Sequence, residues 1–345
     1  MSVRRLILAA VVAILAATRP ILAEEAPPPV KEIFLAHTQR QDSAHVPTAA
    51  MAAEFKRQLE RLSNGRIKVG LFPAGQLGGN REMARLVGKN VVQTAFVTVG
   101  GIAPIYPAIA VTEMPFALSS PEAANRVFDG PFGRRLSEDI EQRTGLTVLG
   151  FGEGGGFFAI TNSRHPVHSP DDLRGLKIRT IPGFKPLEAM IRSLGATPVA
   201  VSSREEFTAL SSGVIDGQMN PPLTVLASRF DDVQKYVTLT EHLYTPLIWV
   251  YNQGAFASLD PSEQEAVRQA ATAALAVGRA VQKTAEASSR GLPALHRRME
   301  VTTLTPAERQ AFKALAQPAV AASIREGLGE EGSQLLAEFM AAAKD

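Results

Sequence analysis

The sequence predicts an α/β protein built from two domains. Its 345 residues exceed the roughly 100–200 that one domain usually takes, and 45% of them are hydrophobic, which is ordinary for a packed core. Strand patterns alternate with helix patterns along most of the chain, which is typical of sheets with mainly parallel strands. A helix expected from Asp260 to Ser289 would be about 45 Å long, longer than one small domain is wide. Such a helix is expected to brace the two domains.

Residues 1–23 have the pattern of a secretory signal peptide. Arg4 and Arg5 precede an apolar run of 12 residues, 6–17, and Ala23 offers a small residue for cleavage. The run is shorter than the roughly 20 apolar residues of a membrane span. Residues 24–29 (EEAPPP) are expected to form a flexible tether. We therefore expect a periplasmic protein that does not itself span the membrane after its signal is removed.

The charge of the mature chain excludes a nucleic-acid partner. Residues 1–23 hold three arginines and no acidic residue, so their removal leaves 33 basic against 34 acidic residues, and the net charge changes from +2 to −1. No basic stripe remains to contact phosphates. The chain has no cysteine, which excludes disulfides, Fe–S clusters and thiol catalysis.

The first half of the mature chain alternates between strand and helix patterns. Apolar residues at helical spacing from Thr48 predict a helix with one buried face. Between Arg66 and Leu71 polar and apolar residues alternate, which predicts a half-buried strand. The other elements expected here are strands at 33–36, 91–99 and 146–151 and helices at 80–88, 121–128 and 132–144.

The second half repeats this style and ends in long helices. Asp260 and Glu263 form a capping box, with Pro261 at the first helical position, which opens the long helix. The other elements expected here are strands at 159–161, 176–179, 237–240 and 247–251 and helices at 185–194, 205–212 and 305–344.

No motif points to catalysis, a cofactor or a metal. Residues 150–155 satisfy G-x-G-x-x-G, but a dinucleotide site needs a helix directly afterwards, and residues 156–161 have a β-like pattern. A flexible crossing between sheets is the favoured interpretation. His165 and His168 have no partner at metal-ligand spacing, and the chain has neither a G-x-S-x-G elbow nor a P-loop.

Three residues are candidates for ligand contacts. Arg179 stands at the C-terminal end of an expected strand, where open α/β sheets place ligands, and its guanidinium can take a carboxylate bidentately. The alternative is a surface arginine paired with a nearby acid. Asn220, before two prolines, either belongs to a plain turn or contacts a ligand oxygen. Trp249 either belongs to the core or walls an apolar pocket.

The chain resembles a known family, the extracytoplasmic solute-binding proteins of TRAP (tripartite ATP-independent periplasmic) transporters. Residues 171–179 (DDLRGLKIR) resemble the family signature "DLKGLKIR". Further similar segments follow in family order over about residues 30–300: Phe72-Pro73 with 75–78 (GQLG), 114–116 (MPF), 194–196 (LGA), 213–221 (GVIDGQMNP), and 233–236 (VQKY) with His242.

The resemblance implies an α/β, two-lobed periplasmic binding protein fold, with a ligand cleft between the lobes and a long bracing helix. Lobe I would comprise residues 30–152 and 243–283, and lobe II residues 153–242 and 284–345. It also implies a protein that is not an enzyme and needs no cofactor. Such a protein hands an organic acid to a TRAP permease of one small and one large membrane subunit, and a sodium gradient drives the transport.

For the site, the resemblance implies that Arg179 holds the ligand carboxylate and that Asn220 orients it or a neighbouring oxygen. Many members carry a second arginine where this chain has Phe158. Together with Trp249, Phe158 favours a monocarboxylate with an apolar or aromatic body. Glu153 either accepts a ligand hydrogen or caps the glycine loop. Further cleft contacts are expected at Thr38, Thr98 and Ser203.

Two alternatives belong to other functional classes. One is a secreted hydrolase or isomerase that acts on a small acid with Glu153 as general base, and turnover of a bound acid would distinguish it. The other is a ligand-sensing module for a membrane receptor, which would share the fold and the binding chemistry.

Overall fold

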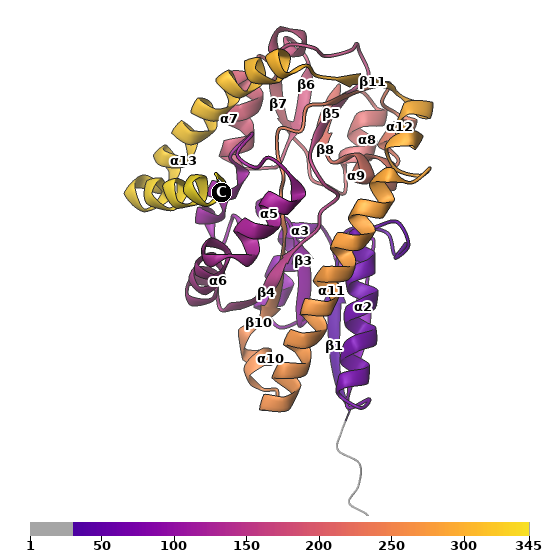
Figure 1. The fold of residues 1–345 in the computed structure, drawn as a ribbon, viewed down its shortest axis with the longest axis vertical. Helices are drawn as coiled ribbons and strands as arrows, with labels where there is room; N and C mark the ends of the chain where they lie inside the picture. Colours follow the sequence, from indigo (N-terminus) through magenta and orange to yellow (C-terminus); the bar gives the residue numbers. More distant parts are fainter. Residues whose placement is uncertain (1–29, 345) are drawn as a thin grey trace, which may run out of the picture. The chain divides into compact units, whose positions relative to one another are not determined.

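The computed structural model describes residues 30–344, in which helices surround two separate β-sheets (Figure 1). This confirms the predicted α/β class. The expected signal peptide at 1–23 and the tether at 24–29 lie outside the described residues. None of the described helices is both long and apolar enough to cross a lipid bilayer.

The first sheet has five strands in the order β2-β1-β3-β10-β4. β1 pairs in parallel with β2 and β3, whereas β10 runs antiparallel to β3 and β4. The strands are β1 (Lys31–Ala36), β2 (Ile67–Phe72), β3 (Thr94–Val97), β4 (Leu146–Gly152) and β10 (Leu247–Asn252). The helices that follow them are α2 (Pro47–Leu62), α3 (Asn80–Gly88), α4 (Val99–Ile102), the 3-10 helix η1 (Pro107–Glu113), α5 (Pro121–Asp129), α6 (Pro131–Thr144) and α10 (Gln253–Ala257).

The second sheet has six strands in the order β11-β9-β5-β8-β6-β7. β6 is parallel to β7 and β8, and β11 is parallel to β9. The strands are β5 (Ala159–Asn162), β6 (Lys177–Thr180), β7 (Thr197–Ala200), β8 (Gly217–Asn220), β9 (Tyr236–Leu239) and β11 (Glu300–Thr303). The helices are η2 (Pro170–Leu173), α7 (Lys185–Ser193), α8 (Glu206–Ser211), α9 (Pro222–Ala227), η3 (Phe230–Asp232) and α12 (Leu292–Arg298).

Both sheets are mixed, so the expectation of mainly parallel strands is only partly correct. The chain passes from the first sheet to the second between β4 and β5, and it returns between β9 and β10. β5 and β10 are the strands that follow these passages, and both run antiparallel to their two neighbours. No helix follows the glycine segment at 150–156, as expected, because Phe157 forms a β-bridge with Tyr244 and residues 159–162 form β5.

The predicted long helix is α11 (Pro261–Ala287), which ends two residues before the expected Ser289. Its capping box forms as predicted: the Glu263 amide donates to the Asp260 side chain at 2.9 Å, and the Asp260 amide donates to the Glu263 carboxylate at 2.9 Å. α11 packs along α2 and β4, and it also contacts α9 and α12 (Figure 1). A Cβ on Gly278 would lie 2.5 Å from the Met51 side chain, so this glycine allows the close approach of α11 and α2. The helix therefore contacts elements of both sheets.

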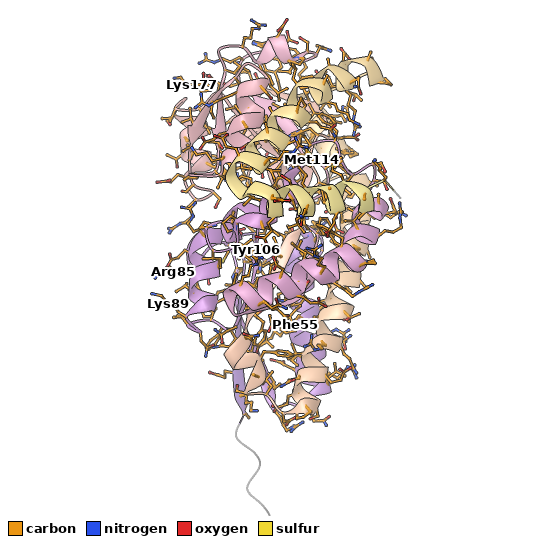
Figure 2. All side chains as sticks on the ribbon, turned by 90° about the vertical axis from the view of Figure 1, so that its left-hand side faces the viewer. Phe55, Arg85, Lys89, Tyr106, Met114 and Lys177 are labelled. Atoms are coloured by element: carbon orange, nitrogen blue, oxygen red, sulfur yellow. The ribbon has the colours of Figure 1, made fainter. Side chains whose placement is uncertain are left out.

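The last helix, α13 (Pro306–Ala342), bends at Gly329, whose φ of 62° and ψ of −146° are not helical. Figure 2 shows its two parts (yellow) meeting at an angle. The helix packs on α7 and η1. Beyond the bend Phe339 contacts Phe132 of α6, with ring centroids 5.3 Å apart. The predicted lobe boundaries at 152/153, 242/243 and 283/284 stay predictions.

Candidate ligand-binding site

A cavity of about 340 Å³ lies where several parallel strands end. Thr38, Ala74 and Thr98 follow the C-terminal ends of β1, β2 and β3, and Ser203 follows β7. Parallel strands place the residues that follow them at the same sheet edge, which is where open α/β sheets bind ligands. The cavity is lined by Thr38, Gln39, Ala74, Gly75, Asn80, Thr98, Gly100, Glu113, Phe158, Arg179, Ile181, Leu187, Ser203, Arg204, Glu206, Met219, Asn220, Thr224, Ser228, Phe230, Leu243 and Thr245.

Arg179 is a buried cation in this cavity, 9% exposed. The sequence places Lys177 and Arg179 on the same face of β6, opposite Ile178, and of these two only Lys177 is exposed. Arg179 Nε donates to the Val201 carbonyl at 3.0 Å, and Nη1 lies 3.8 Å from Glu206 Oε2. In the described part of the chain no hydrogen bond uses its two terminal nitrogens, so the guanidinium fork is available to a ligand carboxylate.

Glu206 balances this cation from the first turn of α8. It is 3% exposed, and burial raises the pKa of its carboxyl, while Arg179 and the amide of Asn220 act in the opposite direction. Asn220 Nδ2 donates to Glu206 Oε1 at 3.0 Å and to Gln218 Oε1 at 2.5 Å. The side-chain nitrogen of Asn220 is therefore engaged by the protein, and its carbonyl oxygen is the atom left for a ligand.

Glu113 is a second buried carboxyl group of the cavity, which the sequence did not indicate. It ends η1 and is 8% exposed. Burial raises the pKa of Glu113 to about 7, and the nearby Thr245 hydroxyl acts in the opposite direction. The available signal was its position directly before the Met114-Pro115-Phe116 segment, but no spacing in the sequence links Glu113 to Thr245.

Arg204 is a second cation on the cavity wall, and it was also missed. It is exposed, and no hydrogen bond or ion pair holds it within the described residues. The sequence feature that could have identified Arg204 is the one that identified Arg179, a position close to the end of a strand. β7 runs parallel to β6 at the sheet edge, so a residue soon after the end of β7 lies near the end of β6. Because Arg204 is exposed, it adds positive charge at the rim of the cavity.

The cavity brings together six of the eight predicted contact residues. Phe158, half-buried, contributes an aromatic wall. Thr98 also caps α4, because its hydroxyl accepts a hydrogen bond from the Gly101 amide at 3.3 Å. The six residues are Thr38, Thr98, Phe158, Arg179, Ser203 and Asn220.

Trp249 and Glu153 do not line the cavity. Trp249 is fully buried on β10 of the first sheet, packed against Phe55 and Phe96 at 4.9 and 4.5 Å between ring centroids. Its indole nitrogen donates to the Thr94 hydroxyl at 2.9 Å. Alternation along β10 places Trp249 on the sheet face that packs with residues of α2 and α11. Of the two interpretations of Trp249, the structure favours the core.

Glu153 lies where the chain leaves the first sheet, and it is 2% exposed. Its Oε2 accepts a hydrogen bond from the Tyr244 hydroxyl at 2.5 Å, and its Oε1 lies 4.0 Å from Arg279 Nε. Burial raises the pKa of Glu153, and Tyr244 and Arg279 partly offset this effect. The protein itself therefore supplies the partners of this carboxyl group.

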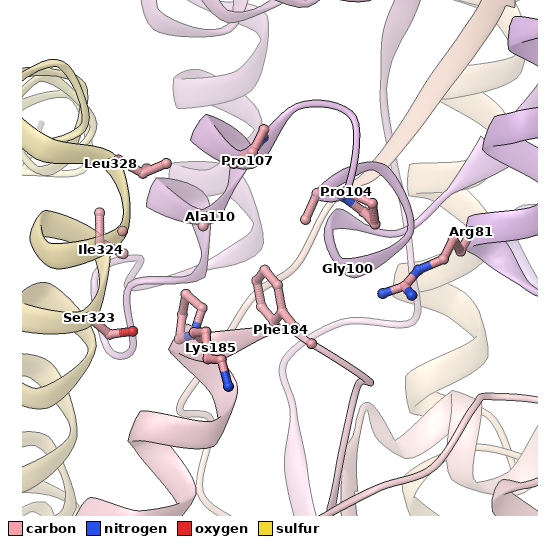
Figure 3. Close-up of a pocket in the computed structure, with 14 residues that line it drawn as sticks. Arg81, Gly100, Pro104, Pro107, Ala110, Phe184, Lys185, Ser323, Ile324 and Leu328 are labelled. Carbon is pink, nitrogen blue, oxygen red and sulfur yellow. The ribbon is translucent and has the colours of Figure 1, made fainter.

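Figure 3 shows another cavity, of about 300 Å³, that differs in character. Phe184, Ile324 and Leu328 give it a largely apolar wall. Its charged side chains are Arg81 and Lys185, and Arg81 Nη2 donates to the Pro182 carbonyl at 2.6 Å. It contains no carboxyl group and none of the predicted contact residues, so the cavity around Arg179 is the candidate site.

Comparison with known proteins agrees with this geometry. Residues 37–326 match the family described as bacterial extracellular solute-binding protein, family 7. The chain is 33% identical to the 2,3-diketo-L-gulonate-binding periplasmic protein YiaO of Escherichia coli, over 67% of this chain and 68% of that protein. It is 31% identical to the C4-dicarboxylate-binding periplasmic protein DctP of Rhodobacter capsulatus, over 60% and 61% of the two chains.

Solved structures are similar over nearly the whole chain. The sugar acid binding protein DctPAm of Advenella mimigardefordensis, in complex with galactonate, superposes with a TM-score of 0.84 at 29% identity, covering 92% of this chain and 98% of that one. A TRAP periplasmic solute binding protein from Polaromonas, bound to D-erythronate, gives 0.80 at 28% identity, covering 90% and 98%. Both the two-lobed fold and the resemblance stated from the sequence are thereby confirmed. This protein belongs to bacterial extracellular solute-binding protein family 7, the family of the TRAP transporter solute-binding proteins.

Proposed function

We propose that this protein is the periplasmic binding component of a sodium-coupled TRAP transporter and that it binds a monocarboxylate through Arg179. The observation that carries the proposal is the buried guanidinium of Arg179, which lines a cavity and whose terminal nitrogens make no hydrogen bond within the described residues. Two lobes, with boundaries at 152/153, 242/243 and 283/284, would close on the acid. The closed form would then deliver the acid to one small and one large permease subunit.

The charges of the cavity suit a single carboxylate at this position. Arg179 lies within 3.8 Å of Glu206, so a buried cation and a buried acid already balance one another. If Glu113 carries its proton, Arg204 at the rim leaves the cavity with one positive charge, which one ligand carboxylate neutralises. A charge-assisted hydrogen bond contributes roughly 1.5–3 kcal/mol, whereas micromolar affinity needs about 8 kcal/mol. Lobe closure and further contacts must therefore supply most of the binding free energy.

The body of the ligand is better matched by hydroxyl groups than by a purely aromatic or apolar group. The expectation of an aromatic body rested on Phe158 and Trp249 together, and Trp249 lies in the core. Polar side chains outnumber aromatic ones on the cavity wall; among them are Thr38, Asn80 and Thr224. Galactonate and D-erythronate, found in structures of relatives, are hydroxylated monocarboxylates. Phe158 remains available to pack against a carbon chain.

A dicarboxylate is the competing ligand class, and Arg204 is the residue that favours it. Two cations in one cavity would match two carboxylates, and one relative is named as a C4-dicarboxylate-binding protein. An enzymatic function has no comparable support, because Glu153, the expected general base, lies away from the cavity wall and is held by Tyr244 and Arg279.

The test is calorimetric titration of the purified protein with a panel of mono- and dicarboxylates. Arg179→Lys keeps a cation near Glu206 but loses the guanidinium fork, so we expect affinity to fall by roughly tenfold or more, the effect of about 1.4 kcal/mol. Arg204→Ala is the matched comparison, with an expected change under about threefold for a monocarboxylate, since an exposed charge pair contributes about 0–1 kcal/mol.

The outcome separates the two ligand classes. If Arg179→Lys loses affinity and Arg204→Ala does not, the result supports a monocarboxylate ligand. If both variants lose similar affinity for a dicarboxylate, the ligand is a dicarboxylate instead. Unchanged affinity in Arg179→Lys would contradict the role of Arg179. Thermal unfolding of each variant without ligand serves as the folding control.

A further inference from the structure

Glu113 and Thr245 are polar residues of the cavity whose side-chain oxygens the protein leaves without partners. Glu113 Oε1 and Thr245 Oγ1 are both buried, and although Thr245 lies near enough to lower the pKa of the Glu113 carboxyl, the geometry gives neither atom a hydrogen-bond partner among the described residues. Both residues line the cavity that contains Arg179. A buried polar atom without a partner costs about 1–3 kcal/mol, so such atoms are rare in folded proteins and call for an explanation.

The location of these two atoms separates them from the other unpartnered ones. Further buried side-chain atoms without a hydrogen bond occur in the described residues, in His37, Thr180, Asp231, His242, Arg279 and Gln282, and those of Asp231 and Arg279 lie within ion-pair distance of Arg298 and Glu153. None of those six residues lines the cavity. Glu113 comes from η1, in the first part of the chain, and Thr245 comes from the passage between β9 and β10. The fold therefore brings two unsatisfied oxygens from distant segments to the same cavity.

We propose that Glu113 and Thr245 form a second subsite of the cavity, which binds a hydroxyl group of the acid held by Arg179. This inference rests on the proposed function, because it needs the ligand carboxylate to occupy Arg179. It makes Glu113 a specificity-determining residue that favours hydroxylated acids over acids with a bare hydrocarbon chain.

A hydroxyl group fits the chemistry of this pair better than a second carboxylate does. A ligand hydroxyl donates one hydrogen bond and accepts others, and both the Thr245 hydroxyl and a protonated Glu113 can donate and accept. Burial raises the pKa of Glu113 to about 7, so a large share of Glu113 carries its proton near neutral pH. A carboxylate at the same place would face the repulsion of ionised Glu113 whenever the proton leaves.

The experiment measures the affinity of the full-length mature protein for pairs of acids that differ only in hydroxyl groups. The pairs are D-erythronate with butanoate, and galactonate with hexanoate. Glu113→Met removes the carboxyl group but keeps a side chain of similar length. We expect it to weaken binding of the hydroxylated acids by about tenfold or more and to change binding of butanoate and hexanoate by less than about twofold, because only the first set loses hydrogen bonds.

Two further variants test the hydrogen-bonding role itself. Glu113→Gln retains a donor and an acceptor, so it is expected to keep the affinity for the hydroxylated acids within about threefold of the wild type. Thr245→Val removes only the hydroxyl group, and we expect it to weaken the same acids by about threefold or more. This second site keeps the test informative if Glu113→Met folds poorly.

The control variant is Glu188→Met, the same substitution at a carboxylate that does not line the cavity. Glu188 lies on α7 beside Leu187 of the cavity wall, but its carboxylate pairs with Lys185 at 3.0 Å. We expect wild-type affinities for all four acids. Equal effects of Glu113→Met on both members of a pair, or no effect on either, would overturn the subsite.

The failure of this inference and that of the proposed function are distinguishable. If the wild type binds no acid of either kind, the proposed function fails and the subsite fails with it. If binding requires Arg179 but does not respond to Glu113 and Thr245, the proposed function stands and the subsite alone is wrong.

Discussion

Two buried glutamates, Glu113 and Glu153, have opposite surroundings, although their neighbours Tyr244 and Thr245 are adjacent in the chain. Glu153 is 2% exposed and accepts a hydrogen bond from the Tyr244 hydroxyl at 2.5 Å, with Arg279 Nε at 4.0 Å. Glu113 is 8% exposed, and its Oε1 and the neighbouring Thr245 hydroxyl have no hydrogen-bond partner among the described residues. One carboxyl group is satisfied within the protein, and the other faces a cavity.

Glu153 belongs to a network of side chains within the protein, whereas the surroundings of Glu113 suit the proposed role in recognition. Arg279, which faces Glu153, also makes two hydrogen bonds to Asp129 of α5, at 2.7 and 2.8 Å. This network joins α11, α5, the passage from β4 to β5 and the passage from β9 to β10, so its members have little left to offer a ligand. Glu113 keeps an oxygen uncommitted at the cavity, which is the property that a binding residue needs.

The largest expected effect is on the pH dependence of stability. Burial raises the pKa of Glu113 from 4.5 to about 7, so the unfolded chain ionises first as the pH rises. The folded state is therefore disfavoured progressively between pH 4.5 and 7, and the full penalty of about 3 kcal/mol is present above pH 7. Glu113→Gln removes this titration. The free energy of unfolding of the variant, relative to the wild type, should therefore be about 3 kcal/mol higher at pH 8 than at pH 4.

Glu153→Gln is the matched comparison in urea unfolding at both pH values. Tyr244 and Arg279 offset part of the burial effect on the pKa of Glu153. The stability that Glu153→Gln gains between pH 4 and pH 8 should therefore be clearly smaller than the gain in Glu113→Gln. The contrast between the two carboxyl groups breaks down if Glu153→Gln gains as much as Glu113→Gln, or if Glu113→Gln shows no pH-dependent gain.

The sequence predicts the site residues that follow strand ends better than it predicts the buried acidic residue of the cavity. Arg179 could be found because its position depends on local signals: an alternating strand and the end of that strand. Thr38, Thr98 and Ser203 follow strand ends in the same way and do line the cavity. Residues placed by local rules at a sheet edge are therefore predictable.

The positions of Glu113 and Trp249 relative to the cavity could not be predicted from local sequence patterns, for two different physical reasons. Glu113 gains its environment from Thr245, which reaches it only after the chain has passed to the second sheet and returned. Trp249 lies on a strand buried on both faces, where five of six residues are buried, so alternation gives no clue to which face meets the ligand. The sequence cannot show which way a single side chain points when nearly every residue of its strand is buried.

A smaller effect is expected from Trp249→Phe, which tests the assignment of Trp249 to the core. The substitution loses the hydrogen bond to Thr94 and part of the ring that packs against Phe55 and Phe96. We expect the free energy of unfolding to fall by about 2 kcal/mol, from the lost bond and the cavity left behind. Affinity for D-erythronate should stay within about twofold of the wild type, since no cavity contact changes. A tenfold loss of affinity without loss of stability would indicate that Trp249 contacts the ligand and would contradict its assignment to the core.

The smallest effects come from the adjacent residues Tyr244 and Thr245, which test the contrast between Glu153 and Glu113 most directly. Tyr244→Phe removes the hydrogen bond to Glu153 and leaves a buried carboxyl group without its donor, so we expect a loss of about 1–2 kcal/mol in the free energy of unfolding. Thr245→Val removes a buried hydroxyl group that has no hydrogen-bond partner among the described residues, so we expect no loss of stability and a gain of about 1 kcal/mol in the free energy of unfolding, the lower end of the cost of such a group. Urea denaturation of the two variants without ligand at pH 7 measures both values. Equal losses would mean that Thr245 is as much a structural residue as Tyr244, and that the protein, not a ligand, is the partner of its hydroxyl group.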